Sequence, residues 1–347
     1  MRPLHHLLAL APLALTAFAV AAADDAPAVA SGGVLGQQLV TGLSNGMIIA
    51  LIAIGYTMVY GIIELINFAH GDLCTLGSFL ALTVAGALGM EVWSGVGGLA
   101  GVILLLVTAA TFCAALNWSI DRVVYRPLRS APKLTLLVSA IGCSFVLVNL
   151  SLFWGGLPMQ VFGGGVAAAA PKDFPALVPD NSLLPDAWNL NFTTSDLLVW
   201  CVTLPLMVAL TVLVRSTRLG KAMRAVAQNP TAASLMGINV DRVIGATFVI
   251  GGALGGFASV IYALYNNTIS FQMGYRTGMD AFTAAVLGGI GSMPGAVVGG
   301  LLIGVVRALS DGYIEARWTN SVVFAILIAT LVFRPSGLLG AKLRDKV

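Results

Sequence analysis

The sequence predicts an all-α polytopic membrane protein. Of its 347 residues, 58% are hydrophobic and only 10% are charged, whereas soluble domains carry about a quarter charged residues. Most of its apolar runs approach the roughly 20 residues that a helix needs to cross a bilayer. They show no alternation of polar and apolar residues, which excludes a membrane barrel and leaves helices. We expect about 8 transmembrane segments, from the runs 37–60, 71–90, 97–120, 134–154, 197–214, 242–266, 279–303 and 321–333.

The N-terminal region resembles a signal peptide over residues 1–23. Arg2 and two histidines precede an apolar stretch, and the small residues of 19–23 offer a cleavage site. An uncleaved first helix is the alternative. Cleavage would leave 24–36 as a short external segment, followed by a transmembrane domain over 37–340 and a cytoplasmic tail over 341–347.

Loop charges predict the orientation of the helices, because loops rich in Lys and Arg face the cytoplasm. The loop 155–196 contains Lys172 as its only Lys or Arg and is therefore predicted to be external. Counting back places the mature N-terminus outside, where cleavage of a signal peptide would leave it. The predicted cytoplasmic clusters are Arg122, Arg126, Arg129 and Lys133, then Arg215, Arg218, Lys221, Arg224 and Arg242, and finally Arg334, Lys342, Arg344 and Lys346.

Counting forward from Arg242 gives three crossings, which would place the C-terminal cluster outside. We therefore expect the stretch 279–310 to be broken into two half-helices at its Gly-Ser-Met-Pro-Gly turn, which would return the C-terminus to the cytoplasm. Broken helices occur at membrane depth only where they are buried in protein or line a cavity.

A polar stretch between Gly61 and Asp72 interrupts the apolar pattern. Ionisable groups inside a membrane usually face a cavity or a partner, so this stretch is a candidate border of a solute path. A solvated cytoplasmic turn is the alternative. The candidate residues are Glu64, Asn67, Phe68, His70 and Asp72.

The glycine-rich break around Pro294 is the second candidate. Glycine allows bends and close backbone approach, and proline stops helical continuation. A plain external turn is the alternative, and a nucleotide-binding P-loop is excluded because its Lys-Ser/Thr ending is missing. The candidate residues are Gly288, Gly289, Gly291, Ser292, Pro294 and Gly295.

The basic loop after 197–214 is too long for a simple connection. Asn229 followed by Pro230 predicts the start of a short helix, and Gly237 predicts its end. Such a helix suits docking into a groove of a partner. The alternative is a solvated loop that only sets the topology.

Other functions find little support. No Ser-His-Asp or H-E-x-x-H pattern occurs, and the histidines cannot form a metal cluster, so we expect neither catalytic nor metal-binding residues. The four cysteines show no C-x-x-C spacing. The net charge of +3 comes from a few short basic clusters and gives no indication of nucleic-acid binding.

Three stretches resemble one known family, the permease subunits of branched-chain amino acid ABC importers of the LivH type. These are "ALIAIGYTMVYGIIELINFAHGD" (50–72), "GKAMRAVAQNPTAASLMGINVDRV" (220–243) and "DAFTAAVLGGIGSMPGAVVGG" (280–300). The resemblance runs from about residue 37 to 340. The signal-like leader and the Asp-rich external loop are longer than in the typical short member. Related urea and short-chain amide permeases carry such extensions, which leaves the substrate open.

The resemblance implies a multi-pass subunit of the bacterial inner membrane, working in an ATP-driven importer of branched-chain or related neutral amino acids. Its implied partners are a homologous second permease subunit, two ABC ATPase subunits and a periplasmic substrate-binding protein. ATP would be used by the partner subunits, and this chain would bind no cofactor. The segments 64–72 and 288–295 would border the translocation path. The positions that match the family's ATPase-coupling loop are Arg224, Ala225, Asn229, Ala232, Gly237, Ile238 and Asn239.

Three alternatives remain at this point. The importer could carry urea or a short-chain amide. A secondary transporter would need a membrane-embedded carboxylate as its ion site, for which Glu64 is the best candidate. A passive channel would need no ATPase.

Overall fold

A computed structural model of the chain describes residues 32–63, 67–93, 95–129, 131–165, 167–179, 181–185 and 190–340. The predicted leader, Glu64 and the tail 341–347 lie outside these residues. The longer helices are α2 (Gly32–Ile63), α3 (Ala69–Ala87), α4 (Val96–Ile120), α6 (Lys133–Gly155), α7 (Thr194–Ser216), α10 (Val240–Asn266), α11 (Met273–Gly288), α12 (Met293–Tyr313) and α13 (Ala316–Phe333). The shorter elements are η1 (Met90–Val92), η2 (Asp121–Tyr125), α5 (Arg126–Leu128), η3 (Gln160–Gly165), α8 (Arg218–Gln228), α9 (Pro230–Leu235), β1 (Lys172–Asp173) and β2 (Thr268–Ile269).

The described residues contain 7 helices long and apolar enough to cross a membrane. This confirms the predicted all-α polytopic membrane protein. The predicted span 71–90 forms α3, which is not among the seven, and the predicted span 279–303 is divided between α11 and α12. Helix α2 already begins at Gly32, so the last residues of the predicted segment 24–36 are helical.

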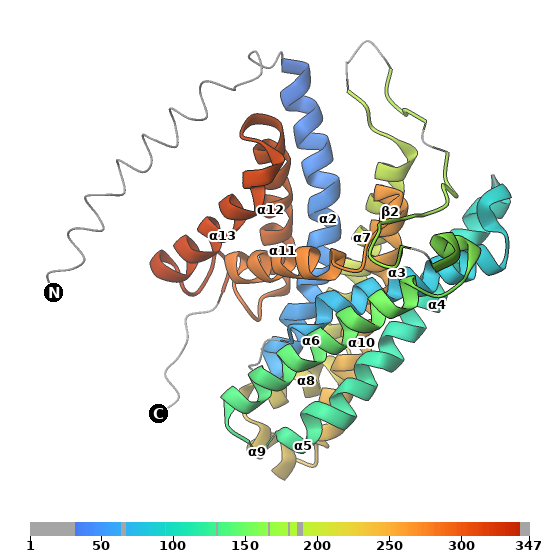
Figure 1. Cartoon of the computed structure of the whole chain (residues 1–347). Coiled ribbons are helices and arrows are strands. Elements are labelled where there is room, and N and C mark those ends of the chain that lie inside the picture. The colour runs from blue at the N-terminus through green and yellow to red at the C-terminus, as the bar shows by residue number, and fades with distance from the viewer. Residues whose placement is uncertain are drawn as a thin grey trace, which may run out of the picture.

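Helices α2 and α10 form the centre of the molecule. The apolar windows of α2 and α10 are 78% and 72% buried, whereas those of α6, α7 and α13 are each 22% buried. The latter three therefore present most of their apolar surface outward, as expected of helices that face lipid or another membrane subunit. Figure 1 shows α12 standing beside α2, with α11 lying crosswise to both.

Glycine allows the central helices to approach closely. A Cβ added to Gly304 of α12 would lie 2.3 Å from the Cα of Gly46 in α2, and one added to Gly300 would lie 2.5 Å from the Cα of Ala50. In a membrane, where lipid tails are as apolar as leucine, such small-residue contacts supply the van der Waals energy of helix association. Gly300 and Gly304 thus allow the close packing of α2 against α12.

The predicted break in the stretch 279–310 is confirmed. Helix α11 ends at Gly288 and α12 begins at Met293. The segment 334–340 then packs on this break, because the amides of Leu338 and Leu339 donate to the carbonyls of Leu287 (2.8 Å) and Gly288 (2.9 Å). These hydrogen bonds place the segment that follows Arg334 beside the break.

The predicted external loop folds over the opposite end of the bundle. Its strand β1 pairs antiparallel with β2, which follows α10. Lys172 is 6% exposed and donates hydrogen bonds to the carbonyls of Phe162 (3.0 Å) and Ala167 (2.7 Å). The only basic side chain of this loop therefore fastens the loop to itself.

Candidate functional site

The polar stretch after α2 turns back into the protein interior. Asn67 is 4% exposed, and its side-chain oxygen accepts a hydrogen bond from the Tyr125 hydroxyl (2.9 Å). The Asn67 amide lies 3.5 Å from the side-chain oxygen of Asn117, whose amide donates to the carbonyl of Phe248 (2.7 Å). This chain of hydrogen bonds joins the α2–α3 connection to η2, α4 and α10. A solvated turn would leave the Asn67 side chain exposed, whereas here it is buried.

His70 and Asp72 lie in the first turn of α3 and are 1% and 2% exposed. The His70 ring packs edge-on against Tyr56 with ring centroids 4.9 Å apart, and neither ring nitrogen has a hydrogen-bond partner among the described residues. Asp72 accepts a hydrogen bond from Ser144 of α6. Since α2 continues to Ile63, contact of His70 with Tyr56 shows that the chain re-enters the bundle after α2.

The glycine-rich break is built by close backbone contact. A Cβ on Gly288 would lie 2.0 Å from the carbonyl oxygen of Gly295. Gly289 and Gly291 have φ values of 106° and 90°, which L side chains rarely adopt. Ser292 caps α12 by accepting a hydrogen bond from the Gly295 amide (3.2 Å), and Pro294 occupies the first turn, where its missing N–H costs no helical bond.

The structure brings the polar stretch and the break together. A Cβ added to Gly61 would lie 3.6 Å from the Cα of Gly291. Phe68, which is partly buried, packs against Phe282 of α11 with ring centroids 6.1 Å apart. A small apolar pocket lies nearby, between α2, α11 and the break. It is lined by Tyr56, Thr57, Tyr60, Phe282, Ala285 and Ile290. A role of either segment in bordering a solute path stays a prediction.

The loop helix predicted at Asn229 is present as α9. The Asn229 side chain caps it by accepting a hydrogen bond from the Ala232 amide (3.0 Å). At the other end the amides of Gly237 and Ile238 donate to the carbonyls of Ser234 and Ala233, and Gly237 has a φ of 83°. This is the Schellman arrangement that stops a helix.

The remaining residues of the predicted coupling loop differ in their accessibility. Arg224 of α8 turns back and donates to the carbonyls of Val214 and Arg215 at the end of α7, so it fixes α8 to α7. Ala225 and Ile238 are partly buried, whereas Ala232 is exposed. Asn239 caps α10 by accepting from the Arg242 amide (3.0 Å).

Leu235 and Met236, at the tip of α9, are the residues that sequence reasoning missed in this loop. Each is 83% exposed. The available signal was the apolar pair itself, which follows the polar stretch 227–234 that contains Gln228, Asn229 and Ser234. An exposed apolar pair on a polar loop is typical of a contact with another protein.

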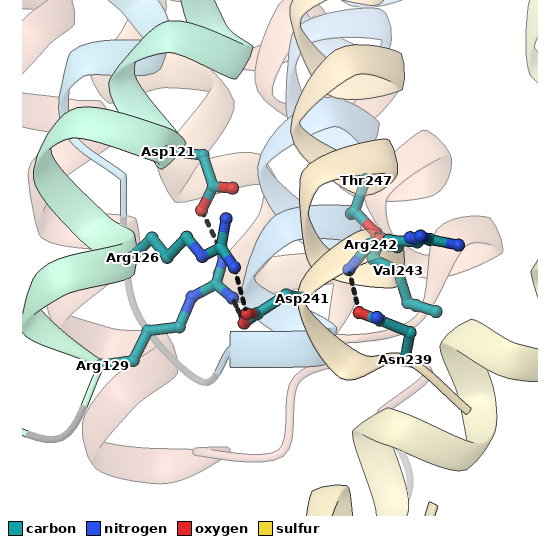
Figure 2. A network of polar contacts seen from close by, with 8 residues as sticks. All are labelled: Asp121, Arg126, Arg129, Asn239, Asp241, Arg242, Val243 and Thr247. Carbon is teal, nitrogen blue, oxygen red and sulfur yellow. Dashed lines mark hydrogen bonds and ion pairs between the residues drawn. The ribbon is translucent and has the colours of Figure 1, made fainter. Parts of the chain in front are cut away.

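Two basic loops meet beside α9 (Figure 2). Asp241, at the start of α10, pairs with Arg126 (2.8 Å) and with Arg129, and Arg129 also binds Asp121 (2.6 Å). These ion pairs place the first two basic clusters at one end of the molecule, where Figure 1 shows α5, α8 and α9. That end lies opposite the start of α2.

A buried ion pair inside the bundle was also missed from the sequence. Asp280 of α11 is 6% exposed, and the Arg307 guanidinium of α12 donates to both of its carboxylate oxygens at 2.6 and 2.7 Å. The signal was that Asp280 and Arg307 are the only charged residues of the stretch 279–310 and lie on opposite sides of the break. Charges in such positions are usually paired with each other.

The described residues contain no group of three His, Cys, Asp or Glu side chains that could hold a metal ion. The polar features described above are hydrogen bonds and ion pairs between protein side chains.

Comparison with known proteins identifies the relatives of this chain. A family model described as "Branched-chain amino acid transport system / permease component" matches residues 38–331. The chain is 42% identical over 319 residues to the high-affinity branched-chain amino acid transport system permease protein LivH of Escherichia coli (strain K12), covering 90% of this chain and 97% of the relative. It is 40% identical over 317 residues to the corresponding permease protein BraD of Pseudomonas aeruginosa, with the same coverage of 90% and 97%. A probable branched-chain amino acid transport permease protein LivM of Methanocaldococcus jannaschii is 29% identical over 143 residues, which is 37% of this chain and 41% of the relative. No solved structure matches.

Proposed function

Since this chain belongs to the family of branched-chain amino acid transport permease components, we propose that it is the membrane subunit of an ATP-driven importer of branched-chain amino acids. It is not an enzyme. ATP hydrolysis belongs to separate partner subunits. The permease supplies the solute path and the surface on which the ATPase subunits dock.

The orientation follows from the ion-paired basic loops. Arg126, Arg129 and Arg224 lie at one end of the bundle with the loop that carries α8 and α9, so this end faces the cytoplasm by the positive-inside rule. The start of α2 and the loop that carries β1 then face the periplasm of a bacterial inner membrane. The C-terminus lies on the cytoplasmic side, because the segment 334–340 packs on the break beside Gly61.

The observation that carries the proposal is the exposed apolar tip of α9. Leu235 and Met236 are each 83% exposed at the basic end of the molecule. They stand on a helix that is capped at both ends, by Asn229 and by Gly237. A rigid helix that projects apolar side chains into the cytoplasm suits insertion into the groove of an ATPase subunit.

Three further partners complete the machine. A homologous second permease subunit would cover one of the outward apolar faces of α6, α7 and α13, which are each 22% buried. One ATPase would dock on each permease subunit. A soluble binding protein would deliver amino acid at the periplasmic end.

The test is a co-purification experiment with the assembled transporter. The double variant Leu235→Asp/Met236→Asp should retain at most about a tenth of the wild-type ATPase, because charge replaces two apolar contacts that each contribute more than 1 kcal/mol when buried. The matched control Leu235→Met/Met236→Leu keeps the apolar surface and should bind normally. ATPase recovery equal to wild type in the double Asp variant would refute docking through α9.

A further inference from the structure

A pocket of about 290 Å³ lies at the periplasmic half of the bundle, between α2, α10, α11 and α12. It is separate from the polar stretch and from the break. Its volume is at the lower end of the range of about 300–1,000 Å³ for small-molecule sites. It therefore fits one small metabolite. The lining residues include the carboxylates and guanidiniums of Arg276, Asp280, Arg307 and Asp311.

These four charges form two helical pairs. Arg276 and Asp280 are four residues apart on α11, and Arg307 and Asp311 are four residues apart on α12, so each pair shares one helix face. The inner members, Asp280 and Arg307, neutralise each other through two hydrogen bonds of 2.7 Å or less. The outer members, Arg276 and Asp311, are both exposed.

The outer charges do not neutralise each other. Within the part of the chain that the structure describes, Arg276 forms no ion pair at 4.0 Å or less, and Asp311 accepts a hydrogen bond only from the Thr319 hydroxyl. The pocket thus holds a separate positive and a separate negative group with a net charge of zero. A ligand that carries both charges satisfies both groups, whereas a purely cationic or anionic ligand leaves one of them facing a like charge.

Part of the pocket wall formed by α2 is apolar, whereas Gln38, Thr41 and Asn45 line the rest of it. Ile48, Ile49 and Ile52 of α2 line the pocket and are each at most 6% exposed. Their branched side chains belong to the buried core, so the wall is held rigid. A branched aliphatic group placed against it would bury apolar surface at about 25 cal/mol per Å².

We propose that this pocket is a transit site for the zwitterionic amino acid. The α-carboxylate binds the Arg276 guanidinium, the α-ammonium binds the Asp311 carboxylate, and the aliphatic side chain lies against Ile48, Ile49 and Ile52. The Asp280–Arg307 pair holds α11 to α12 so that the two outer charges stay apart. This assignment rests on the proposed function, because the amino acid must enter the bundle from the periplasmic end.

The experiment measures leucine uptake by the full transporter reconstituted in proteoliposomes with its partner subunits. Arg276→Gln and Asp311→Asn should each lower the uptake rate per assembled complex by about tenfold or more, because each removes one charge-assisted contact. Arg276→Lys, which keeps the charge, should fall between wild type and Arg276→Gln.

Arg317→Gln is the matched control. Its guanidinium is 70% exposed on α13, pairs with Glu315 and does not line the pocket, so uptake should be unchanged. Wild-type uptake in both Arg276→Gln and Asp311→Asn would overturn this proposal. So would a loss that is fully restored by excess binding protein, because the two charges would then dock that protein. A wild-type transporter that imports no leucine would instead refute the proposed function, and this proposal with it.

Discussion

The ion pair between α11 and α12 gives the sharpest test of the packing. Replacing Arg307 with methionine keeps the volume of the side chain but leaves the Asp280 carboxylate, whose side chain is 9% exposed, without its partner. Two hydrogen bonds of 2.6 and 2.7 Å are lost together. Removing one partner of a buried pair costs about 3–5 kcal/mol, because the remaining charge stays buried and uncompensated.

The double variant Asp280→Leu/Arg307→Met removes both charges and should recover most of this stability. Replacing a buried pair with apolar groups of similar volume is often neutral. The coupling free energy of the double-mutant cycle should therefore reach about 2 kcal/mol or more.

The assay is thermal unfolding of the detergent-solubilised protein, followed by size-exclusion chromatography. At about 2 °C per kcal/mol for a large domain, the single variant should lose about 6 °C in Tm or more. Arg276→Met is the control, because this neighbouring guanidinium forms no ion pair among the described residues, and its Tm should stay close to wild type. A single variant as stable as wild type, or a double variant whose loss equals the sum of the single losses, would refute the buried-pair argument.

Two further predictions concern the break and the external loop. Gly288→Ala should destabilise the protein by about 2 kcal/mol or more, since its Cβ would lie 2.0 Å from the Gly295 oxygen. The control Gly142→Ala, whose Cβ meets nothing within 4 Å, should be neutral or stabilising in the same Tm measurement. Equal effects of the two substitutions would contradict the close contact. Lys172→Met should leave the carbonyls of Phe162 and Ala167 without their donor and speed proteolysis of the loop several-fold in oriented vesicles. The control Lys221→Met, which replaces an exposed lysine, should leave the cleavage rate of this loop unchanged. A wild-type cleavage rate in Lys172→Met would refute the role of Lys172 in holding the loop.

The helices could be predicted closely from hydropathy. The apolar run 134–154 became α6 (Lys133–Gly155), and the run 242–266 became α10 (Val240–Asn266). Local capping rules were equally effective at α9, because its caps involve only residues three to five positions apart.

Long-range pairing could not be predicted in the same way. Asp280 and Arg307 are 27 residues apart, and their contact depends on how far α12 folds back along α11 after the break. The chain of hydrogen bonds through Asn67, Tyr125 and Asn117 spans 58 and 50 residues and depends on three helix packings at once. Hydropathy is averaged over a window of residues, so a single polar residue within an apolar stretch hardly changes it. The hydropathy pattern therefore did not indicate which of the few charged residues pair with each other.

Helix α11 connects the proposed transit site to the glycine-rich break. Its first two turns hold Arg276 and Asp280 in the pocket, and its last residue, Gly288, contacts both α12 and the segment 334–340. At 16 residues it is about 24 Å long, shorter than the hydrocarbon core of roughly 30 Å. Arg276 and Asp280 therefore lie at the end of α11 that is away from the break. The positive φ values of Gly289 and Gly291 allow the chain to reverse direction there, so that α12 runs back along α11 and Arg307 reaches Asp280.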